Sequence, residues 1–545
     1  MTAAAPVPHA PDTVERRTRA TRLALIAAFL VVLFAPFTVR ALLPRPHDER
    51  AASSAGALEL RIVTPHQRDI RQVFERGFSD WHRARFGKPV RVVYMVPGGT
   101  NDMVRYLSDF YDSRRDPRTR ALPPESSVTP DVDVVFGGGD TTFDRELKPF
   151  LKPVRLPAGA LEVAFPEPDL AGVALYERTQ GGAPPRWVGV VLASFGVVYN
   201  PELYRALGLP PPRTFTDLGR PELANLVALA DPTRSGSAAV AYMMVLQRSM
   251  ADAERAFMEA RGKPLEKAEA ARDPAYQAAV ARGFHDGMSG LLRIAANARY
   301  FTDSGGRPPS DVSQGEAAAG MAIDFYARVL EGDVGRERIV YVAPQAATAV
   351  TPDPVAVLYG VRGEREVLAN RFVEYLLSAD AQRLWNLRAG KNPYLARSLR
   401  RLPIRRDVYA DRTGFADTTN PFEETHGFNL RGDWMKLFRD TRKVWAAMFM
   451  DAGPDLTRAY RAVLAVPDAR VRESLLSQLA DVPVQMSEIA KEKATLDALA
   501  ATRDDRAEDP RLVATRQRNA WAERFRRHYA DVEARARASR EGSTP

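Results

Sequence analysis

The sequence predicts an α/β fold that is built from more than one domain. Runs with strand character alternate with amphipathic helical runs as far as about residue 400, and 545 residues suffice for several compact units. Such alternation is typical of a parallel-type sheet, whose ligand sites lie beyond the carboxyl ends of its strands. From about Leu402 the pattern changes to long helices with few strand-like runs. We therefore expect a helical C-terminal extension over residues 402–545.

The first α/β block begins near Leu58. Strands are expected at residues 58–66, 89–96 and 131–136, with helices at 70–87 and 97–110. The ends of these strands carry His66, then Gly98, Gly99 and Thr100, and then Gly137, Gly138, Gly139 and Asp140. These residues are candidates for one ligand site.

A second block begins at a long apolar strand, residues 187–200. Residues 226–247 predict a strand, a proline-bearing loop and a helix, and further strands are expected at 321–329 and 338–344. A helical segment should follow at 362–387. The charged stretch 500–539 predicts a solvated helix, and the apolar spacing in 432–450 predicts a helix that packs on the first block or docks another protein.

The N-terminus predicts a membrane anchor. Arg16, Arg17, Arg19 and Arg22 precede an apolar run at 23–39, so residues 1–22 are expected in the cytoplasm, 23–43 in the membrane and 44–57 in a polar linker. A cleavable signal is the alternative, although the segment after the apolar run lacks a good A-x-A site. Everything beyond the linker is then expected outside the inner membrane, or free in the periplasm if the segment is cleaved.

Composition excludes several classes of function. The chain has no cysteine, so disulfides, Cys nucleophiles and Cys-ligated metals are ruled out. Its 77 Lys and Arg against 68 Asp and Glu give only +9, spread along the chain without a nucleic-acid-binding motif. With seven His and no GxSxG, HExxH or Walker loop, no enzyme and no cofactor are predicted. A hydrolase that uses carboxylates alone is the alternative that motifs do not exclude.

Several motifs together resemble a known family. They are a strand ending in TPH at residues 64–66, VDVVFGGGD at 132–140, SFGVVYNPELYRALGLPPPRTFTDL at 194–218, LADPTRSGSA at 229–238 and AIDFYA at 322–327. Their order resembles the extracellular solute-binding proteins of ABC importers, in the branch of ferric-iron, phosphonate, thiamine and sugar-phosphate binders. The resemblance covers residues 58–399.

The resemblance implies two α/β lobes that close over a ligand by hinge motion. Lobe one would take residues 58–193 and 345–401, and lobe two residues 194–344. The crossovers would lie near residues 190–193 and 342–344. Such proteins carry out no chemistry. They deliver a small solute, here expected to be anionic, to a permease driven by ATPase subunits.

The start of a helix is the main candidate for binding an anion. Thr233, Ser235, Gly236 and Ser237 bring hydroxyls and free N–H groups to the positive end of a helix dipole, and Arg234 adds a charge. Ordinary N-capping is the alternative. The two glycine clusters of the first block allow close backbone approach to a ligand, and tight structural turns are their alternative.

Iron is the second ligand hypothesis, and it rests on the resemblance. His66 stands where ferric-binding relatives place a metal-ligating His, and Asp324 and Tyr326 stand at the strand end where such relatives carry two adjacent tyrosines. Phe325 replaces the first tyrosine here, which removes a phenolate ligand. A third hypothesis is a membrane-tethered sensor or scaffold that transmits lobe closure through the C-terminal helices.

Overall fold

The computed structural model describes Phe29 and residues 57–263, 265–270, 272–423, 428–501 and 508–541. The predicted cytoplasmic segment, anchor and linker therefore lie outside the described residues, apart from Phe29 and Ala57. Within the described ranges no helix combines the length and apolarity needed to cross a bilayer. Residues 59–81 and 92–545 form one compact unit, which contains the lobes described below apart from Leu58 and residues 82–91. In the other unit, the Leu58 N–H donates to the Pro89 carbonyl at 3.1 Å.

Lobe one is built on a mixed sheet of order β14-β7-β13-β3-β1-β2, with β4 beside β13. Its strands are β1 (Leu58–Val63), β2 (Val90–Met95), β3 (Val134–Phe136), β4 (Leu151–Lys152), β7 (Val188–Ala193), β13 (Thr351–Leu358) and β14 (Leu402–Pro403). Strands β1 and β3 pair in parallel, with Ile62 beside Val134, as predicted. Strand β13 departs from the prediction because it runs antiparallel to both β3 and β7.

The helices and the small hairpin of lobe one surround this sheet. They are α3 (Arg68–Phe86), α4 (Thr100–Asp112), α5 (Asp140–Thr142), α6 (Ala160–Ala164), α13 (Glu364–Leu376), α14 (Ala379–Leu384), β5 (Asp169–Leu170) and β6 (Val173–Ala174). The core contains Phe74, whose ring centroid lies 4.1 Å from that of Trp385 and 6.1 Å from that of Phe136. These contacts join α3, the sheet and the chain after α14. The helical segment predicted at 362–387 is therefore two helices, separated at Ser378, which caps α14.

Lobe two is built on a sheet of order β10-β9-β11-β8-β12. Its strands are β8 (Phe195–Tyr199), β9 (Val227–Ala230), β10 (Ala298–Thr302), β11 (Ala319–Ile323) and β12 (Val340–Val342). Its helices are α7 (Pro201–Ala206), α8 (Gly236–Arg261), α9 (Lys267–Ala270), α10 (Pro274–Ala296), α11 (Arg307–Ser313) and α12 (Asp324–Val334). Strand β10 has no counterpart in the sequence-based prediction.

The strand predicted at 321–329 is wrong beyond Ile323. Helix α12 begins at Asp324, because the Asp324 carboxylate accepts the N–H of Phe325 at 2.7 Å and so occupies a first-turn donor. An acidic residue is also stabilised in the first turn of a helix by the dipole. Tyr326 consequently lies on a helix rather than on a strand.

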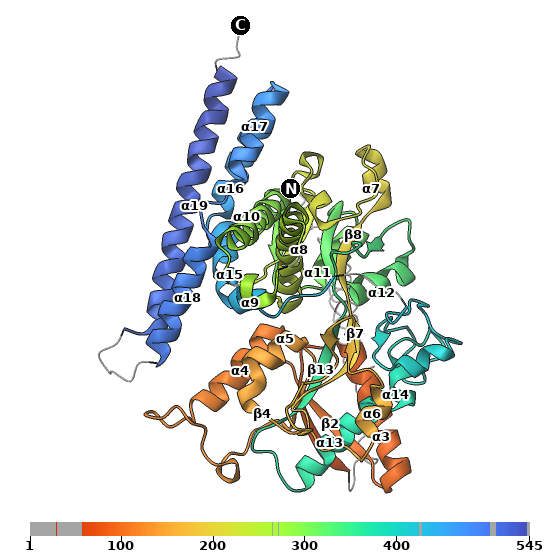
Figure 1. The fold of residues 1–545 in the computed structure, drawn as a ribbon. Helices are drawn as coiled ribbons and strands as arrows, with labels where there is room; N and C mark the ends of the chain where they lie inside the picture. The colour runs from red at the N-terminus through yellow and green to blue at the C-terminus, as the bar shows by residue number, and fades with distance from the viewer. Residues whose placement is uncertain are drawn as a thin grey trace, which may run out of the picture. The chain divides into compact units, whose positions relative to one another are not determined.

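The chain passes between the lobes at Ser194, which separates β7 from β8, and again between β12 and β13 (Figure 1). Both connections join strands of two different sheets, which is the two-lobed arrangement that the sequence predicts. A third passage leaves β14 and reaches the C-terminal helices. The long helices predicted from residue 402 begin only at Phe438, because residues 404–423 and 428–437 are mostly irregular with short 3₁₀ turns.

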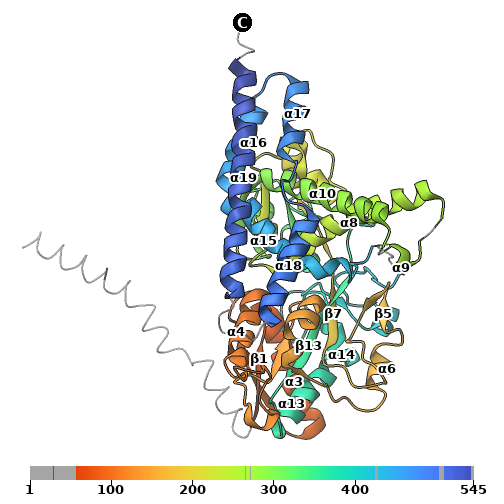
Figure 2. The same ribbon diagram turned by 60° about the vertical axis from the view of Figure 1, so that its left-hand side comes forward.

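The C-terminal extension packs on lobe two. It holds α15 (Phe438–Trp445), a π-helical turn (Ala446–Asp451), α16 (Gly453–Leu464), α17 (Ala469–Leu479), α18 (Met486–Ala501) and α19 (Pro510–Glu541). Both views show α19 lying along the other helices of the extension (Figures 1 and 2). Trp445 and Met448 share one buried apolar cluster with α8 and α10, so the hypothesis that 432–450 packs on lobe one is wrong.

The prediction of a solvated terminal helix is also wrong. One face of α19 is buried in the same cluster, through Trp521, Phe525, Tyr529, Val532 and Ala536. The Tyr529 hydroxyl donates to the Met448 carbonyl at 3.3 Å. The arginines of α19 occupy its other faces, where Arg518 pairs with Asp451 at 2.7 Å.

Candidate functional site

A cavity of about 530 Å³ lies between the two lobes. Loops that follow β1, β2 and β3 contribute to its wall in lobe one, together with the start of β13. Lobe two contributes the start of α8, the loop after β10 and the start of α12. Of the predicted site residues, these line the cavity: His66, Gly98, Gly99, Thr100, Gly138, Asp140, Ser235, Gly236, Ser237 and Tyr326. Gly137, Thr233 and Asp324 do not.

The start of α8 presents hydroxyl and N–H groups to the cavity. Ser235 is the N-cap, and its Oγ accepts the Ala238 N–H at 3.3 Å and lies 3.1 Å from the Ser237 Oγ. Gly236 and Ser237 form the first turn, where the N–H groups are the positive end of a 26-residue helix. Thr233 instead donates its hydroxyl to Asp231 at 2.7 Å, which shapes the preceding turn.

The start of α4, in lobe one, meets the start of α8. Gly99 caps α4, and a Cβ placed on Gly236 would lie 3.2 Å from the Cβ of Thr100. Asn101 donates from Nδ2 to the Thr233 carbonyl at 2.8 Å, a hydrogen bond between the two lobes. Two helix N-termini therefore converge at one end of the cavity.

The glycine loop after β3 adopts a backbone that glycine favours. Gly137, Gly138 and Gly139 have φ values of 89°, 119° and 82°. A Cβ on Gly137 would lie 2.6 Å from the Cε1 of His66, so this glycine accommodates the imidazole ring. The N–H groups of Gly138 and Gly139 donate to the Asp353 carboxylate at 2.6 and 3.0 Å. The protein's own carboxylate thus occupies donors that the sequence predicts for a ligand.

Asp353, His66 and Arg401 form a buried polar cluster under this loop. The Nε2 of His66 lies 3.1 Å from the Asp353 Oδ2 and 3.2 Å from Arg401, while Arg401 donates to Asp353 at 3.0 Å. Burial opposes ionisation of Asp353, but Arg401 and the hydrogen bond from His66 hold the pKa of this carboxyl well below its usual range. Burial lowers the pKa of His66, which keeps the imidazole neutral at pH 7.

Two further carboxyls line the cavity from lobe one. Burial, with the charges of Asp144 and Asp353 adding to it, raises the pKa of Asp140 to about 6. Burial also raises the pKa of Glu146, although Arg442 and Arg439 act against it. Burial therefore favours the protonated form of both groups.

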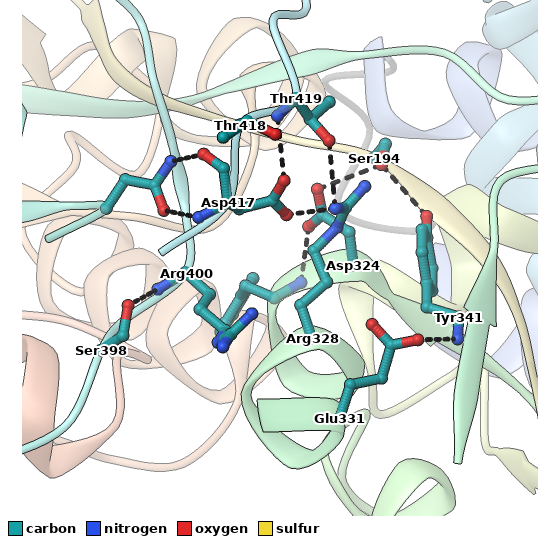
Figure 3. A network of polar contacts seen from close by, with 12 residues as sticks. Ser194, Asp324, Arg328, Glu331, Tyr341, Ser398, Arg400, Asp417, Thr418 and Thr419 are labelled. Carbon is teal, nitrogen blue, oxygen red and sulfur yellow. Dashed lines mark hydrogen bonds and ion pairs between the residues drawn. The ribbon is translucent and has the colours of Figure 1, made fainter. Parts of the chain in front are cut away.

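Asp324 lies in a polar network at the crossover rather than in the cavity (Figure 3). It accepts the Ser194 hydroxyl at 3.1 Å, and the Ser194 hydroxyl lies 3.0 Å from that of Tyr341. Arg328 of α12 pairs in the same network with Asp417, a residue of the third passage between the lobes. Asp417 in turn forms two hydrogen bonds with Asn386 of lobe one. Its N–H donates to the Asn386 Oδ1 at 3.1 Å, and its carbonyl accepts from the Asn386 Nδ2 at 2.7 Å.

Tyr326 lines the cavity, and burial raises the pKa of its phenol to about 12. Phe325 also lines it, with the guanidinium of Arg401 4.3 Å from the ring centroid. Across the described ranges, no group of three or more His, Asp and Glu is arranged to hold a metal ion. The iron hypothesis would therefore depend on His66, which already contacts Asp353 and Arg401, and on Tyr326.

Several cavity residues were missed from the sequence. Asp303, Ser304 and Gly305 follow the unpredicted strand β10, and a Cβ on Gly305 would lie 2.6 Å from the Ser237 Oγ. The sequence indicates Asp353 only weakly, because this residue stands between two prolines at the start of an apolar run. Phe438 and Arg442 of α15 also line the cavity. Nothing in the local sequence distinguishes Arg401 or Arg442 from the other arginines.

Comparisons with known proteins place part of this chain in a family. Residues 176–401 match the model described as bacterial extracellular solute-binding protein. The phosphoglycerate transport regulatory protein PgtC of Salmonella typhimurium is 26% identical over 207 residues, which are 38% of this chain and 42% of that protein. The protein of the same name from Salmonella typhi matches equally. The match thus spans less than half the length of these relatives.

Solved structures of periplasmic binding proteins also align. The protein AfuA from Actinobacillus pleuropneumoniae, with fructose-6-phosphate bound, is 16% identical at a TM-score of 0.47, over 71% of this chain and 97% of that one. The periplasmic binding protein P5PA is 15% identical at a TM-score of 0.49, and the alignment covers 71% of this chain and 98% of that one. The family match itself rests on the sequence model. Residues 176–401 therefore match a bacterial extracellular solute-binding domain, and the family resemblance predicted from the motifs is confirmed.

Proposed function

We propose that the protein is the solute-binding component of an ABC importer and that its cleft captures a small anionic or phosphorylated solute. The observation that carries the proposal is the convergence of the α4 and α8 N-termini on one cavity between the lobes. Helix N-termini combine free N–H groups with a positive dipole end, which suits phosphate and carboxylate groups. PgtC, the relative named for phosphoglycerate transport, supports an organic phosphate.

The anionic group of the solute belongs at the start of α8. There Ser235 and Ser237 offer hydroxyls, and Arg234 offers a charge that is only loosely paired with Asp303, at 3.8 Å. The N–H groups of Gly138 and Gly139 are already bonded to Asp353, so that glycine loop contributes shape rather than donors. The rest of the solute would then extend toward His66 and Tyr326.

A thermal-shift and calorimetric screen of the full chain tests this proposal. The probes are inorganic phosphate, 3-phosphoglycerate, a sugar phosphate, a phosphonate, thiamine and Fe(III) citrate. A ligand at 100 times its Kd stabilises the fold by about 2.7 kcal/mol. We expect a shift with an organic phosphate that is lost in Ser235→Ala with Ser237→Ala and kept in the control Ser249→Ala, farther along α8. A shift with iron alone, lost in Tyr326→Phe, would instead favour the ferric-iron hypothesis.

Anchoring belongs to the same proposal. We infer that residues 23–43 remain as a transmembrane helix and hold the lobes on the periplasmic side, where they meet the permease and ATPase subunits. The apolar run with its preceding arginines supports this inference. Alkaline carbonate extraction of membranes tests it, because a retained anchor keeps the protein in the pellet and a cleaved signal releases it.

A membrane-tethered sensor is the second candidate function. It is favoured by the name of PgtC, a transport regulatory protein, and by a C-terminal extension that contacts the cavity. Deleting this chain separates the two functions. Loss of solute uptake with an intact, expressed permease indicates an importer component, whereas normal uptake with lost transcriptional response to the solute indicates a sensor.

A further inference from the structure

The C-terminal extension contributes directly to the wall of the cavity. Phe438 and Arg442 line it, although both lie beyond residue 401, where the match to the solute-binding family ends. They stand four residues apart on α15 and so share one face, with the Arg442 guanidinium 5.7 Å from the Phe438 ring centroid. This face of α15 points to the cleft.

The last residues of α15 fix the helix in lobe two. Val444 and Trp445 are fully buried in the core cluster of that lobe, where the Trp445 ring centroid lies 5.6 Å from that of Tyr242 on α8. The Trp445 Nε1 donates to the Met288 Sδ of α10 at 3.3 Å. Arg442 is therefore carried by a helix that is packed into the core of lobe two.

Arg442 is hydrogen-bonded to the turn that leads into α8. Its Nε donates to the Pro232 carbonyl and its Nη2 to the Thr233 carbonyl, both at 3.0 Å. Among the residues that the structure describes, no hydrogen bond reaches Nη1 and no ion pair neutralises the guanidinium. Burial lowers the pKa of Arg442, with Glu146 and Asp231 acting against it, but arginine remains charged in proteins. Arg439 on the same helix instead pairs with Asp497 at 3.8 Å.

We infer that Arg442 contacts the anionic group of the solute and, with the N-terminus of α8, forms one composite anion site. This inference rests on the proposed function and assigns part of the binding site to the extension. Two carbonyl hydrogen bonds orient the guanidinium, so little side-chain entropy is lost when Nη1 meets an anion. Solute binding is thereby linked to α15 and to the helices that pack on it.

Calorimetry of the full chain with 3-phosphoglycerate and with inorganic phosphate tests the inference. The variants are Arg442→Gln and Arg442→Lys, with Arg458→Gln, at an exposed ion pair of α16, as the control. A charge-assisted hydrogen bond lost from a partly buried site predicts an affinity decrease of about ten- to a hundredfold in Arg442→Gln. Arg442→Lys keeps the charge and should recover most of the affinity, while Arg458→Gln should bind as the wild type does.

Affinity within about twofold of wild type in Arg442→Gln would overturn the inference. If Ser235→Ala with Ser237→Ala still loses binding in that case, the proposed anion site stands and only the role of Arg442 falls. If wild type binds no anion, the proposed function fails first. Should Arg442→Gln not fold, a crystal structure of the wild-type complex with 3-phosphoglycerate decides: a phosphate oxygen within hydrogen-bond distance of Nη1 supports the inference, and a phosphate elsewhere refutes it.

Discussion

The Asp353 carboxylate accepts the backbone N–H of Gly138 at 2.6 Å and thereby occupies the glycine loop of lobe one with an internal anion. The same carboxylate pairs with Arg401, whose side chain is fully buried. Because these donors are already satisfied, the anion site that we propose lies on the opposite wall, at the start of α8. Within lobe one, the negative charge of Asp353 is therefore balanced by Arg401 without a solute.

We predict that Asp353→Ala strongly destabilises the fold. The substitution leaves the buried Arg401 without its carboxylate, and removing one partner of a buried ion pair costs roughly 3–5 kcal/mol. Urea unfolding at neutral pH measures this loss. Asp407→Ala, which removes the exposed partner of Arg405, serves as control and should cost less than about 1 kcal/mol. Equal stability of the two variants would contradict the assigned role of Asp353.

Asp140 predicts a pH dependence of solute binding. Burial raises its pKa to about 6, so its carboxyl gains negative charge beside the bound anion as the pH rises through that value. We expect the ratio of wild-type Kd to Asp140→Asn Kd to be near one at about pH 5 and several-fold larger at about pH 7.5. Taking the ratio cancels the ionisation of the phosphate itself. Asp109→Asn, on the exposed side of α4, should show a constant ratio.

The raised pKa of Asp140 also determines how this carboxyl changes the stability of the fold with pH. A carboxyl whose folded-state pKa is raised favours the fold while it is protonated, and this contribution is lost as the pH rises from about 4 through about 6. Asp140→Asn should therefore raise the Tm at about pH 7.5 and leave it nearly unchanged at about pH 4. An equal change in Tm at both pH values would argue against a buried, raised carboxyl.

The sequence predicts the parts of the site that follow parallel strands. His66 and the run from Gly138 to Asp140 meet in one cavity because β1 and β3 pair in parallel, so their carboxyl ends share an edge. Asp353 escapes that rule because β13 runs antiparallel, so its amino end lies at the same edge. Strand direction depends on pairing far along the chain, which no local pattern encodes.

The positions of Arg401 and Arg442 also depend on long-range packing, so the local sequence does not predict them. Arg401 meets a histidine 335 residues away, and Arg442 reaches the cavity only because α15 is packed on lobe two. The sequence does indicate the buried face of α19, because the aromatic residues Trp521, Phe525 and Tyr529 recur every four residues. Their apolar spacing was obscured by the arginines between them, which occupy the other faces of the helix.

We predict that Trp521→Ala unfolds or strongly destabilises the extension together with lobe two. Trp521 is fully buried in the cluster that these parts share, and truncating a buried tryptophan costs about 3–5 kcal/mol. Leu512→Ala removes an apolar side chain that is 60% exposed on the same helix and should change stability by less than about 0.5 kcal/mol. Chemical unfolding followed by tryptophan fluorescence and by circular dichroism compares them. Two separate transitions in wild type would show that the extension folds independently, contrary to this expectation.

The ion pair between Arg328 and Asp417 predicts a restraint on lobe opening. Arg328 belongs to lobe two, whereas Asp417 is bonded to Asn386 of lobe one, so the pair connects the lobes beside the crossover at Ser194 (Figure 3). Asp417→Asn keeps the shape of the side chain but removes its charge. We expect the solute-free protein to open more often, with a larger radius of gyration in X-ray scattering and a several-fold weaker affinity. Glu423→Gln, at the exposed pair with Arg412, should leave both unchanged. If Asp417→Asn scatters and binds as wild type does, the hinge is held by the β-strand crossovers alone.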